Sequence, residues 1–316
     1  ERELVRPQPT SLGAAIPPVV DIADRIRPAV AQLQAGYADH TSTGSGVIFR
    51  SDGHILTNLH VVEGASNVKV VLASGRRLSG RVLGADPDTD TAVVKIDGGP
   101  FPVATLGTAK DLRVGQTAIA IGSPLGLAGG PSVTVGVVSA LHRQRKNRAN
   151  GPALVDMVQT DAPMSPGSSG GALLDDDGAV IGITTVAAAD SGADGLGFAI
   201  PIDVARSVAE QMMNTGKVTH VWLGVEGSDV DGATAGDLNL DGGAMVAQVT
   251  PGSPAQRAGL NAQDVIVGAD GATIRSMGEL VVVLRGRTPG DPVTLDVMRD
   301  GQRRTLRVVL APRPGS

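Results

Sequence analysis

Short apolar runs that alternate with turn signals dominate the first two thirds of the chain. Between residues 44 and 140, Val- and Ile-rich segments are separated by clusters of Gly, Pro, Asn or Asp about every ten residues, and no long amphipathic stretch intervenes. Similar runs return at 154–160, 179–186 and 196–201. This spacing is typical of an antiparallel sandwich or barrel.

Two segments show the period of a helix instead. One covers 21–34 and contains Pro28, which limits the helix because proline lacks a backbone N–H. The other covers 202–214, carries Asp203 in its first turn and is followed by Gly216 as its expected stop. The predicted buried face of this second helix consists of Ile202, Ala205, Val208, Ala209 and Met212.

A second unit begins near Val218, with a boundary at about 215–219. Its predicted helix covers 277–286, and its predicted strands lie at 221–226, 244–249, 264–271, 293–299 and 304–310. The sequence therefore predicts four parts: a flexible lead-in with the start of a helix at 1–27, a β-rich unit at 28–216, a second unit at 218–312 and a tail at 313–316.

Composition narrows the classes of protein that fit this pattern. The 316 residues are 41% hydrophobic and 19% charged, which is typical of a globular protein, and aromatic residues make up only 2%. A net charge of -5 gives no electrostatic reason to expect nucleic acid. The absence of cysteine excludes disulfides, a thiolate nucleophile and a cysteine-based zinc site. No apolar run reaches the roughly 20 residues of a membrane span, but the chain begins at Glu1, which leaves room for a signal or membrane anchor upstream.

The most specific local pattern is DAPMSPGSSGG at 161–171. Small residues allow a substrate to approach closely, and glycines permit a sharp turn that can direct successive N–H groups into one space. Ser169 is then the candidate nucleophile, and Gly167, Ser168 and Ser169 form the candidate oxyanion hole, with the N–H groups of Gly167 and Ser169 as donors. The alternative is an ordinary Gly/Ser surface loop.

A serine nucleophile needs a base, usually a histidine that a carboxylate holds in place. We expect His60 to be this base, because it ends the strand-like run ILTNLHVV. Asp90 directly precedes the apolar run TAVVKI and is the best-placed carboxylate, whereas Asp86 and Asp88 flank Pro87 and are expected to be solvated. The remaining histidines lie in turns, polar loops or the boundary between the units: His40, His54, His142 and His220.

Several motifs in this order resemble the HtrA-type serine proteases. They are TNLHVVEGA, DPDTDTAVVKI, GSPLGL, TVGVVSA, TDAPMSPGSSGGALL and GLGFAIP, and the resemblance runs from about 28 to 312. It implies a mainly β, chymotrypsin-like double six-stranded β-barrel at 28–216, followed by an α+β PDZ domain at 218–312. It also implies a serine endopeptidase of protein quality control and the stress response, located in the periplasm or cell envelope. The implied partners are unfolded proteins, C-terminal peptides and two further copies in a homotrimer, and no metal or other cofactor is expected.

The chain departs from the family pattern at some positions. Ser168 stands where the family commonly has Asn, which puts the stability of the loop in question, and Pro163 and Met164 replace residues that are usually Ala and Ile. The segment between Tyr37 and Gly44 is short, as in the simpler trimeric members. By resemblance, the loops at 123–132, 142–153 and 185–196 are regulatory; a solvated loop is the alternative for the basic segment at 142–153.

The expected primary substrate pocket is uncharged and favours cleavage after small or medium aliphatic residues. The resemblance to chymotrypsin-like proteases places its base six residues before the nucleophile, at Pro163, and its walls at 182–185 and 197–200; the residues singled out are Pro163, Thr184, Thr185, Phe198 and Ile200. The alternative is that these residues belong to the core of the barrel.

The second unit contains a candidate peptide groove. The segment WLGV places a glycine turn before a strand, where N–H groups can bind a terminal carboxylate while the strand edge pairs with the peptide. The resemblance places a helix with Met277 and Val281 opposite it, and the proposed groove residues are Trp222, Leu223, Gly224, Val225, Leu280 and Leu284. The alternative is again that the apolar residues are core.

Two other functions compete with this interpretation. The GSSGG segment also fits the G-x-S-x-G pattern of α/β-hydrolases, but that fold needs a later histidine, and only His220 follows. A non-enzymatic chaperone or scaffold that binds exposed hydrophobic chains without cutting them is the second alternative.

Overall fold

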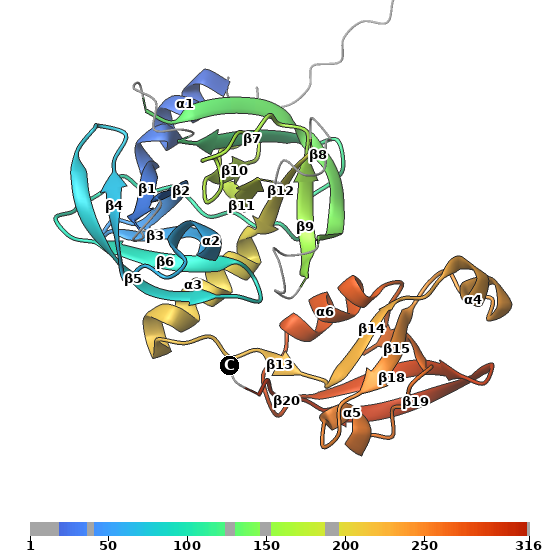
Figure 1. Cartoon of the computed structure of the whole chain (residues 1–316). Helices are drawn as coiled ribbons and strands as arrows, with labels where there is room; N and C mark the ends of the chain where they lie inside the picture. The colour runs from blue at the N-terminus through green and yellow to red at the C-terminus, as the bar shows by residue number, and fades with distance from the viewer. Residues whose placement is uncertain (1–18, 37–40, 124–129, 146–152, 187–195, 315–316) are drawn as a thin grey trace, which may run out of the picture.

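The computed structural model describes residues 19–36, 41–123, 130–145, 153–186 and 196–314. Two β-barrels lie next to each other, and a smaller α+β domain follows them along the chain (Figure 1). The mainly β class with two six-stranded barrels is therefore confirmed. No helix among these described residues is long and apolar enough to cross a membrane.

The first barrel closes in the strand order β1-β2-β3-β6-β5-β4, with all neighbours antiparallel. Its strands are β1 Val30–Gly36, β2 Thr41–Arg50, β3 His54–Asn58, β4 Asn67–Val71, β5 Arg77–Asp86 and β6 Thr91–Ile96. Aliphatic side chains fill its interior, among them Leu33, Ile48, Ile55, Val70 and Val94. Valine, isoleucine and leucine side chains thus form this core, in a chain that has few aromatic residues.

The second barrel closes in the order β10-β11-β12-β9-β8-β7. Its strands are β7 Thr117–Gly122, β8 Ser132–Arg145, β9 Leu154–Thr160, β10 Ala172–Leu174, β11 Val180–Val186 and β12 Gly197–Pro201. The basic segment expected as a loop from 142 begins inside β8, because β8 pairs with β9 as far as Arg145. His142 is therefore not in a loop, and its Nδ1 lies 2.7 Å from Asp156 Oδ1 on β9.

The helical prediction for 21–34 was wrong in its second half. Helix α1 (Val19–Ile26) ends before a short 3-10 turn, η1 (Arg27–Ala29), and β1 follows at once. Pro28 ends the helical hydrogen-bond pattern, and residues from Val30 onward exchange their backbone bonds with β2 and β4. The barrel thus provides partners for a segment whose apolar spacing alone resembles a helix.

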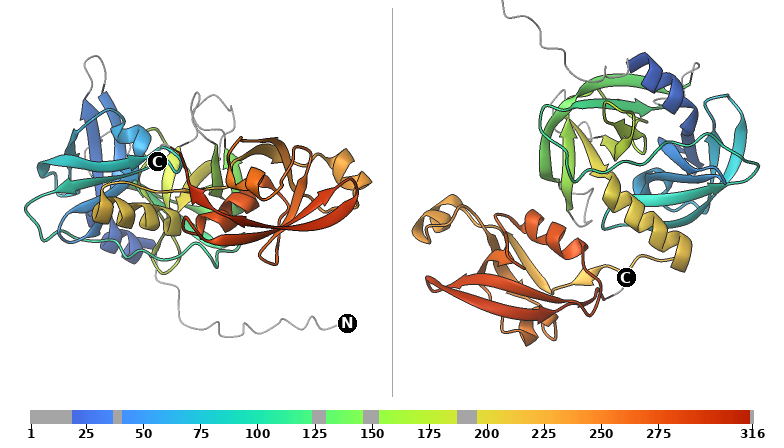
Figure 2. Two further views of the ribbon diagram at one scale, coloured as in Figure 1. Left: turned by 90° about the horizontal axis from the view of Figure 1, so that it is seen from below. Right: turned by 180° about the vertical axis from the view of Figure 1, so that it is seen from behind.

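The helix predicted at 202–214 is α3 (Ile202–Thr215), and its five predicted core residues are buried. Gly216 ends the helix with φ 75°, and its N–H donates to the Met212 carbonyl, as expected for a left-handed C-terminal cap. Helix α3 packs against both barrels and leads to the last domain (Figures 1 and 2).

The last domain consists of a five-strand path, β14-β15-β16-β18-β19, with β17 paired to β16 and a separate β13–β20 pair. Its strands are β13 Val221–Trp222, β14 Val225–Asp229, β15 Ala244–Val249, β16 Val265–Ala269, β17 Ala272–Thr273, β18 Pro292–Arg299, β19 Gln302–Val309 and β20 Ala311–Pro312. Its helices are α4 Gly232–Asp237, α5 Pro254–Arg257 and α6 Met277–Arg285. A separate aliphatic core holds this domain together.

The junction between the domains is charged, and here the prediction for Asp86 was wrong. Asp86 is only 4% exposed, and its Oδ1 lies 2.8 Å from His220 Nε2. The neighbouring Asp88 contacts Arg313, and Arg285 Nη1 of α6 donates to the Val155 carbonyl at 3.2 Å. Asp86 is buried because the chain returns to it 134 residues later.

Burial by itself raises the pKa of Asp86, but hydrogen bonds from His220 and Thr89 and the charge of His220 bring that pKa below its ordinary value. A carboxyl whose pKa is lower in the folded state stabilises the fold above its unfolded pKa of about 4, and the effect disappears as pH falls through the folded pKa. We expect Asp86→Ala to lower the free energy of unfolding by about 2 kcal/mol at pH 7. Urea unfolding at pH 7 and pH 3 should show that this difference shrinks in acid.

The control for this prediction is Asp97→Ala. Asp97 pairs with Lys95 at 2.8 Å, but its side chain is 97% exposed, so its removal should change the urea midpoint little. An equal effect of the two substitutions, or a difference between Asp86→Ala and the parent protein that grows in acid, would contradict the role of the buried pair.

Candidate active site

His60 and Asp90 are brought together where β3 and β6 meet. The expectation that His60 ends a strand was wrong. Strand β3 stops at Asn58, and His60 lies on the one-turn helix α2 (Leu59–Val62). Asp90 directly precedes β6 with φ 52°, a left-handed conformation that turns it toward α2. Its carbonyl accepts from Leu59 N–H at 3.0 Å and from Asn58 Nδ2 at 3.1 Å, which fixes the two segments to each other.

The Asp90 carboxylate holds both the ring and the backbone of His60. Its Oδ2 lies 2.7 Å from His60 Nδ1, and its Oδ1 accepts from His60 N–H at 3.0 Å. Asp90 is 5% exposed, whereas the His60 ring remains partly exposed. Because a carboxylate only accepts, the proton of a neutral ring resides on Nδ1 and leaves Nε2 as the basic nitrogen.

Ser169 lies in a tight turn that ends at β10. Gly167 and Gly170 adopt φ 94° and 86°, conformations that favour glycine, so the sequence pattern has a direct conformational reason. The turn is closed by Ser168 N–H to the Ser165 carbonyl at 2.9 Å and by Gly171 N–H to the Ser168 carbonyl at 3.0 Å. Ser169 itself is 6% exposed.

Strand β11 supports one side of this turn. Thr184 Oγ1 donates to the Ser168 carbonyl at 2.7 Å, and the Thr184 carbonyl accepts from Gly170 N–H at 2.7 Å. Thr184 was expected in the substrate pocket, but its hydroxyl is used to hold the turn. Ser168 Oγ accepts from Ser165 N–H at 3.4 Å, so the side chain that replaces Asn folds back onto its own turn.

Strand β2 supports the other side through Ser45, a residue that the sequence analysis did not single out. Ser45 N–H donates to the Ser169 carbonyl at 2.7 Å, and Ser45 Oγ donates to the Gly167 carbonyl at 2.6 Å. A Cβ on Gly44 would lie 2.5 Å from Val61 Cγ2 and 3.0 Å from the Ser169 carbonyl oxygen. Gly44 therefore lies against both Val61, the residue after His60, and the backbone of Ser169.

Gly170 is expected to tolerate no side chain. A Cβ at this position would lie 2.1 Å from the Ser45 carbonyl oxygen and 2.4 Å from Thr57 Oγ1, and its positive φ adds strain. We expect Gly170→Ala to destabilise the fold by about 3 kcal/mol, a decrease that thermal unfolding measures. Gly75→Ala is the control, because Gly75 also has a positive φ but no atom lies within 4 Å of its Cβ position. Equal losses would mean that φ alone, and not the contact between the barrels, limits position 170.

The residues expected to line a primary pocket are only partly brought together. Pro163 is exposed, and its carbonyl accepts from Thr134 Oγ1 at 2.7 Å. The next residue, Met164, packs toward β12, since a Cβ on Gly197 would lie 2.6 Å from Met164 Cε. The side chain directed at this strand is thus Met164, one position after the residue that the count from Ser169 selects.

The other pocket candidates belong mainly to the core. Thr185 and Ile200 are 2% exposed, and Ile200 packs into the aliphatic core that includes α3. Phe198 is half-buried, with the Arg145 guanidinium 5.8 Å from its ring centroid, a cation–π arrangement. Much of the expected regulatory loops at 123–132, 142–153 and 185–196 lies outside the described residues, and so do residues 37–40, which include His40.

The candidate peptide groove lies between β14 and α6. Strand β14 ends the sheet path, with β15 on its other edge, and a Cβ on Gly227 would lie 2.6 Å from Met277 Cε of α6. Gly224 has φ 86° and precedes β14, as the carboxylate-binding turn requires. Trp222 pairs with Ala311, whereas Leu223, Leu280 and Leu284 are buried in the core beneath the groove.

The described residues were also compared with two other kinds of site, a metal centre and the catalytic site of an α/β-hydrolase. Among them, no group of three or more His, Asp or Glu side chains could hold a metal ion. His220, which the α/β-hydrolase alternative needs, contacts Asp86. That alternative is wrong, because the β-sheets around Ser169 are closed antiparallel barrels and not an open parallel sheet.

Comparison with known proteins gives the same two parts. Residues 44–183 match the trypsin-like peptidase domain, and residues 221–310 match the PDZ domain. A DegP-like periplasmic serine endoprotease of Halomonas elongata is 43% identical over 88% of this chain, but the chain covers only 58% of that protein. The serine protease HhoA of Synechocystis is 42% identical, with 85% of this chain and 70% of that protein aligned. A solved HtrA-type protease, AlgW with tripeptide, has a TM-score of 0.80 and 37% identity, and the alignment covers 95% of this chain and 99% of that one.

Proposed function

This chain belongs to the HtrA-type serine proteases, and on that premise we propose that it is a serine endopeptidase whose catalytic triad is His60, Asp90 and Ser169. The observation that carries this proposal is the buried Asp90 carboxylate, 2.7 Å from His60 Nδ1, beside the turn that carries Ser169. The identities of the three residues and their order along the chain fit the same chemistry.

The proposed reaction is acyl transfer from a peptide bond. Ser169 Oγ attacks the peptide carbonyl while His60 Nε2 takes the hydroxyl proton, and the N–H groups of Gly167 and Ser169 stabilise the oxyanion. His60 then gives this proton to the leaving amine, and an acyl ester on Ser169 remains. Water repeats the sequence: His60 takes its proton, the acid is released, and Ser169 recovers its hydrogen. Asp90 keeps the ring oriented and stabilises its protonated form.

The proposed specificity is for an uncharged aliphatic residue before the scissile bond. Met164, facing Gly197, replaces Pro163 as the pocket residue that we infer. The candidate residues themselves are uncharged, and the neighbouring Arg145 guanidinium lies over the Phe198 ring, so an aliphatic side chain loses less hydration here than a charged one.

The PDZ domain is proposed to bind C-terminal or extended peptides by strand addition at β14. The free side of β14 and the left-handed Gly224 support this mode of binding. Similarity to periplasmic serine endoproteases supports a role in quality control, with unfolded proteins as substrates, and an extracytoplasmic location. From the family resemblance we also propose a homotrimeric assembly. Light scattering on the purified protein measures the last of these directly.

A fluorophosphonate probe tests the proposed activity. The probe reacts with an activated serine, so we expect a single adduct on Ser169 when labelled peptides are identified by mass spectrometry. Casein digestion in parallel distinguishes a protease from a scaffold. A protein that binds unfolded clients, cuts none of them and carries no adduct on Ser169 would be a chaperone or scaffold.

A further inference from the structure

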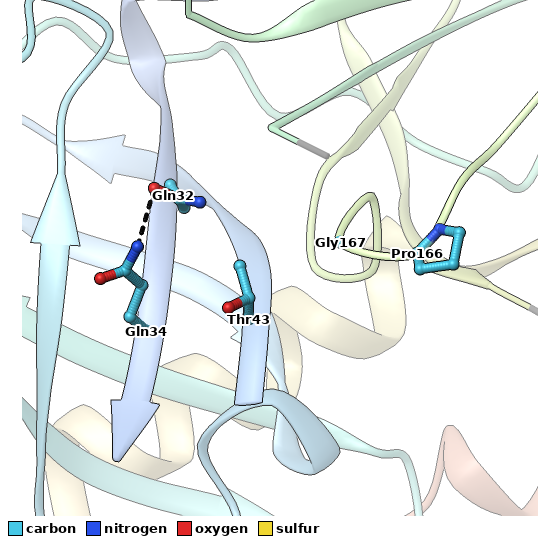
Figure 3. Close-up of a pocket in the computed structure, with 5 residues that line it drawn as sticks. All are labelled: Gln32, Gln34, Thr43, Pro166 and Gly167. Atoms are coloured by element: carbon cyan, nitrogen blue, oxygen red, sulfur yellow. Dashed lines mark hydrogen bonds between the residues drawn. The ribbon is translucent and has the colours of Figure 1, made fainter. Parts of the chain in front are cut away.

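A cavity of about 270 Å³ lies beside the turn that carries Ser169 (Figure 3). Gln32 and Gln34 of β1, Thr43 of β2, and Pro166 and Gly167 of the turn line it. Pockets for drug-sized ligands measure roughly 300–1,000 Å³, so this cavity is better suited to one amino-acid side chain. All five lining residues are uncharged; Gln32 and Gln34 offer side-chain amides, and Thr43 offers a hydroxyl.

One carboxamide in the cavity has a defined orientation. Gln34 Nε2 donates to Gln32 Oε1 at 3.2 Å, and Gln32 is only 7% exposed. With its oxygen held by Gln34, Gln32 directs its own Nε2 toward the side of Gly167, as Figure 3 shows. The cavity therefore presents an N–H donor from Gln32, and Thr43 adds a hydroxyl that can accept or donate.

The position of the cavity identifies which half of a substrate would reach it. The Ser169 turn lies between β11, which it contacts through Thr184, and β2, which it contacts through Ser45. The inferred acyl-side pocket, with Met164 and Gly197, belongs to the second barrel. The cavity lies on the β1–β2 side, so a peptide crossing Ser169 would place residues of its leaving-amine half there.

We propose that this cavity selects a carboxamide side chain, Gln or Asn, at the first or second residue after the scissile bond. The inference rests on the proposed peptidase function. The substrate amide oxygen accepts from Gln32 Nε2, and its NH2 group donates to Thr43 Oγ1, while Gln34 acts as a positioning residue. An aliphatic side chain would leave the Gln32 donor without an acceptor, and none of the five lining residues is a cation that could compensate the lost hydration of a carboxylate.

Fluorogenic peptides with one common acyl-side sequence test this proposal. Gln, Leu, Glu or Lys is placed at each of the two positions after the scissile bond, and kcat/KM is measured for each peptide. We expect Gln to exceed Leu by about fivefold at one of the two positions, the effect of one net hydrogen bond. Equal rates for Gln and Leu at both positions, or a preference for Glu, would overturn the proposal.

Two variants attribute the preference to the cavity. Gln32→Leu should bring the Gln-to-Leu ratio close to one, and Gln32→Glu, which keeps an acceptor for Gln34 Nε2, should shift the preference toward Lys. Because each ratio is taken within one enzyme, a general loss of activity cancels. If Gln32→Leu fails to fold, Gln32→Glu decides, and an unchanged ratio in that variant rejects the assignment of Gln32.

The control is Gln302→Leu, an exposed substitution at the start of β19 in the PDZ domain, and it should leave the ratio unchanged. Fluorophosphonate labelling separates this inference from the function on which it rests. A labelled, active enzyme with no selectivity would reject the cavity inference alone. An enzyme that neither reacts with the probe nor cuts any peptide would reject both.

Discussion

Replacing Ser169 by alanine is expected to lower kcat for casein or peptide cleavage by about 10⁶-fold, which is below detection in most assays. The substitution removes the hydroxyl that we propose forms the acyl ester, and the N–H donors of the turn are not nucleophiles. The fold should persist, because the Ser169 contact to β2 is made by its backbone carbonyl, which accepts from Ser45 N–H at 2.7 Å.

Casein digestion, fluorophosphonate labelling and thermal unfolding measure these effects together. Ser79→Ala is the matched control, since Ser79 is exposed on β5 of the first barrel. We expect Ser79→Ala to behave as the parent protein in all three assays. Residual digestion by the Ser169→Ala protein at a measurable fraction of the parent rate would mean that a different residue carries the reaction.

Asp90→Asn is expected to lower kcat by about 10⁴-fold with little change in KM. One oxygen of Asp90 accepts from the His60 N–H at 3.0 Å, and an amide oxygen can keep that contact. Its NH2 group then faces His60 Nδ1, which must become the acceptor. The ring proton moves to Nε2, so His60 can no longer take the proton of Ser169.

Steady-state kinetics on a fluorogenic peptide measures this loss. The matched control is Asp52→Asn, because Asp52 Oδ1 also lies 2.7 Å from a histidine Nδ1, that of His54, in the same barrel. Its pKa is lowered by Arg50 first and then by His54, so it too is a charged partner at neutral pH. We expect the control to retain activity within about twofold. A comparable loss in both variants would mean that the loss does not depend on the position of Asp90 beside His60.

The sequence determined the features that depend on local periodicity and backbone preference. The β-rich pattern predicted strands throughout both barrels, and the 3.6-residue spacing of 202–214 predicted all five buried residues of α3. Gly216 and Gly170 adopt positive φ angles, for which their residue type is the clearest signal. The apolar run TAVVKI predicted the strand that Asp90 directly precedes, β6 (Thr91–Ile96).

Only the tertiary structure decided which polar groups are buried and what they contact. Asp86 is adjacent in sequence to a turn, yet His220 covers it from the other domain. Ser45 supports the Ser169 turn from β2, 122 residues before Gly167, and Thr184 supports it from β11. Gln32 of β1 lines the same cavity as Gly167.

The physical reason is the range of each interaction. A side chain's position along a helix or strand follows from its neighbours in sequence, so periodicity reveals it. Burial, hydrogen bonding and the pKa of a carboxyl depend on groups that arrive from elsewhere when the barrels close and the domains meet. The sequence therefore predicted the strands. The closure and packing of the strands decided which residues support the Ser169 turn and which form the charged junction.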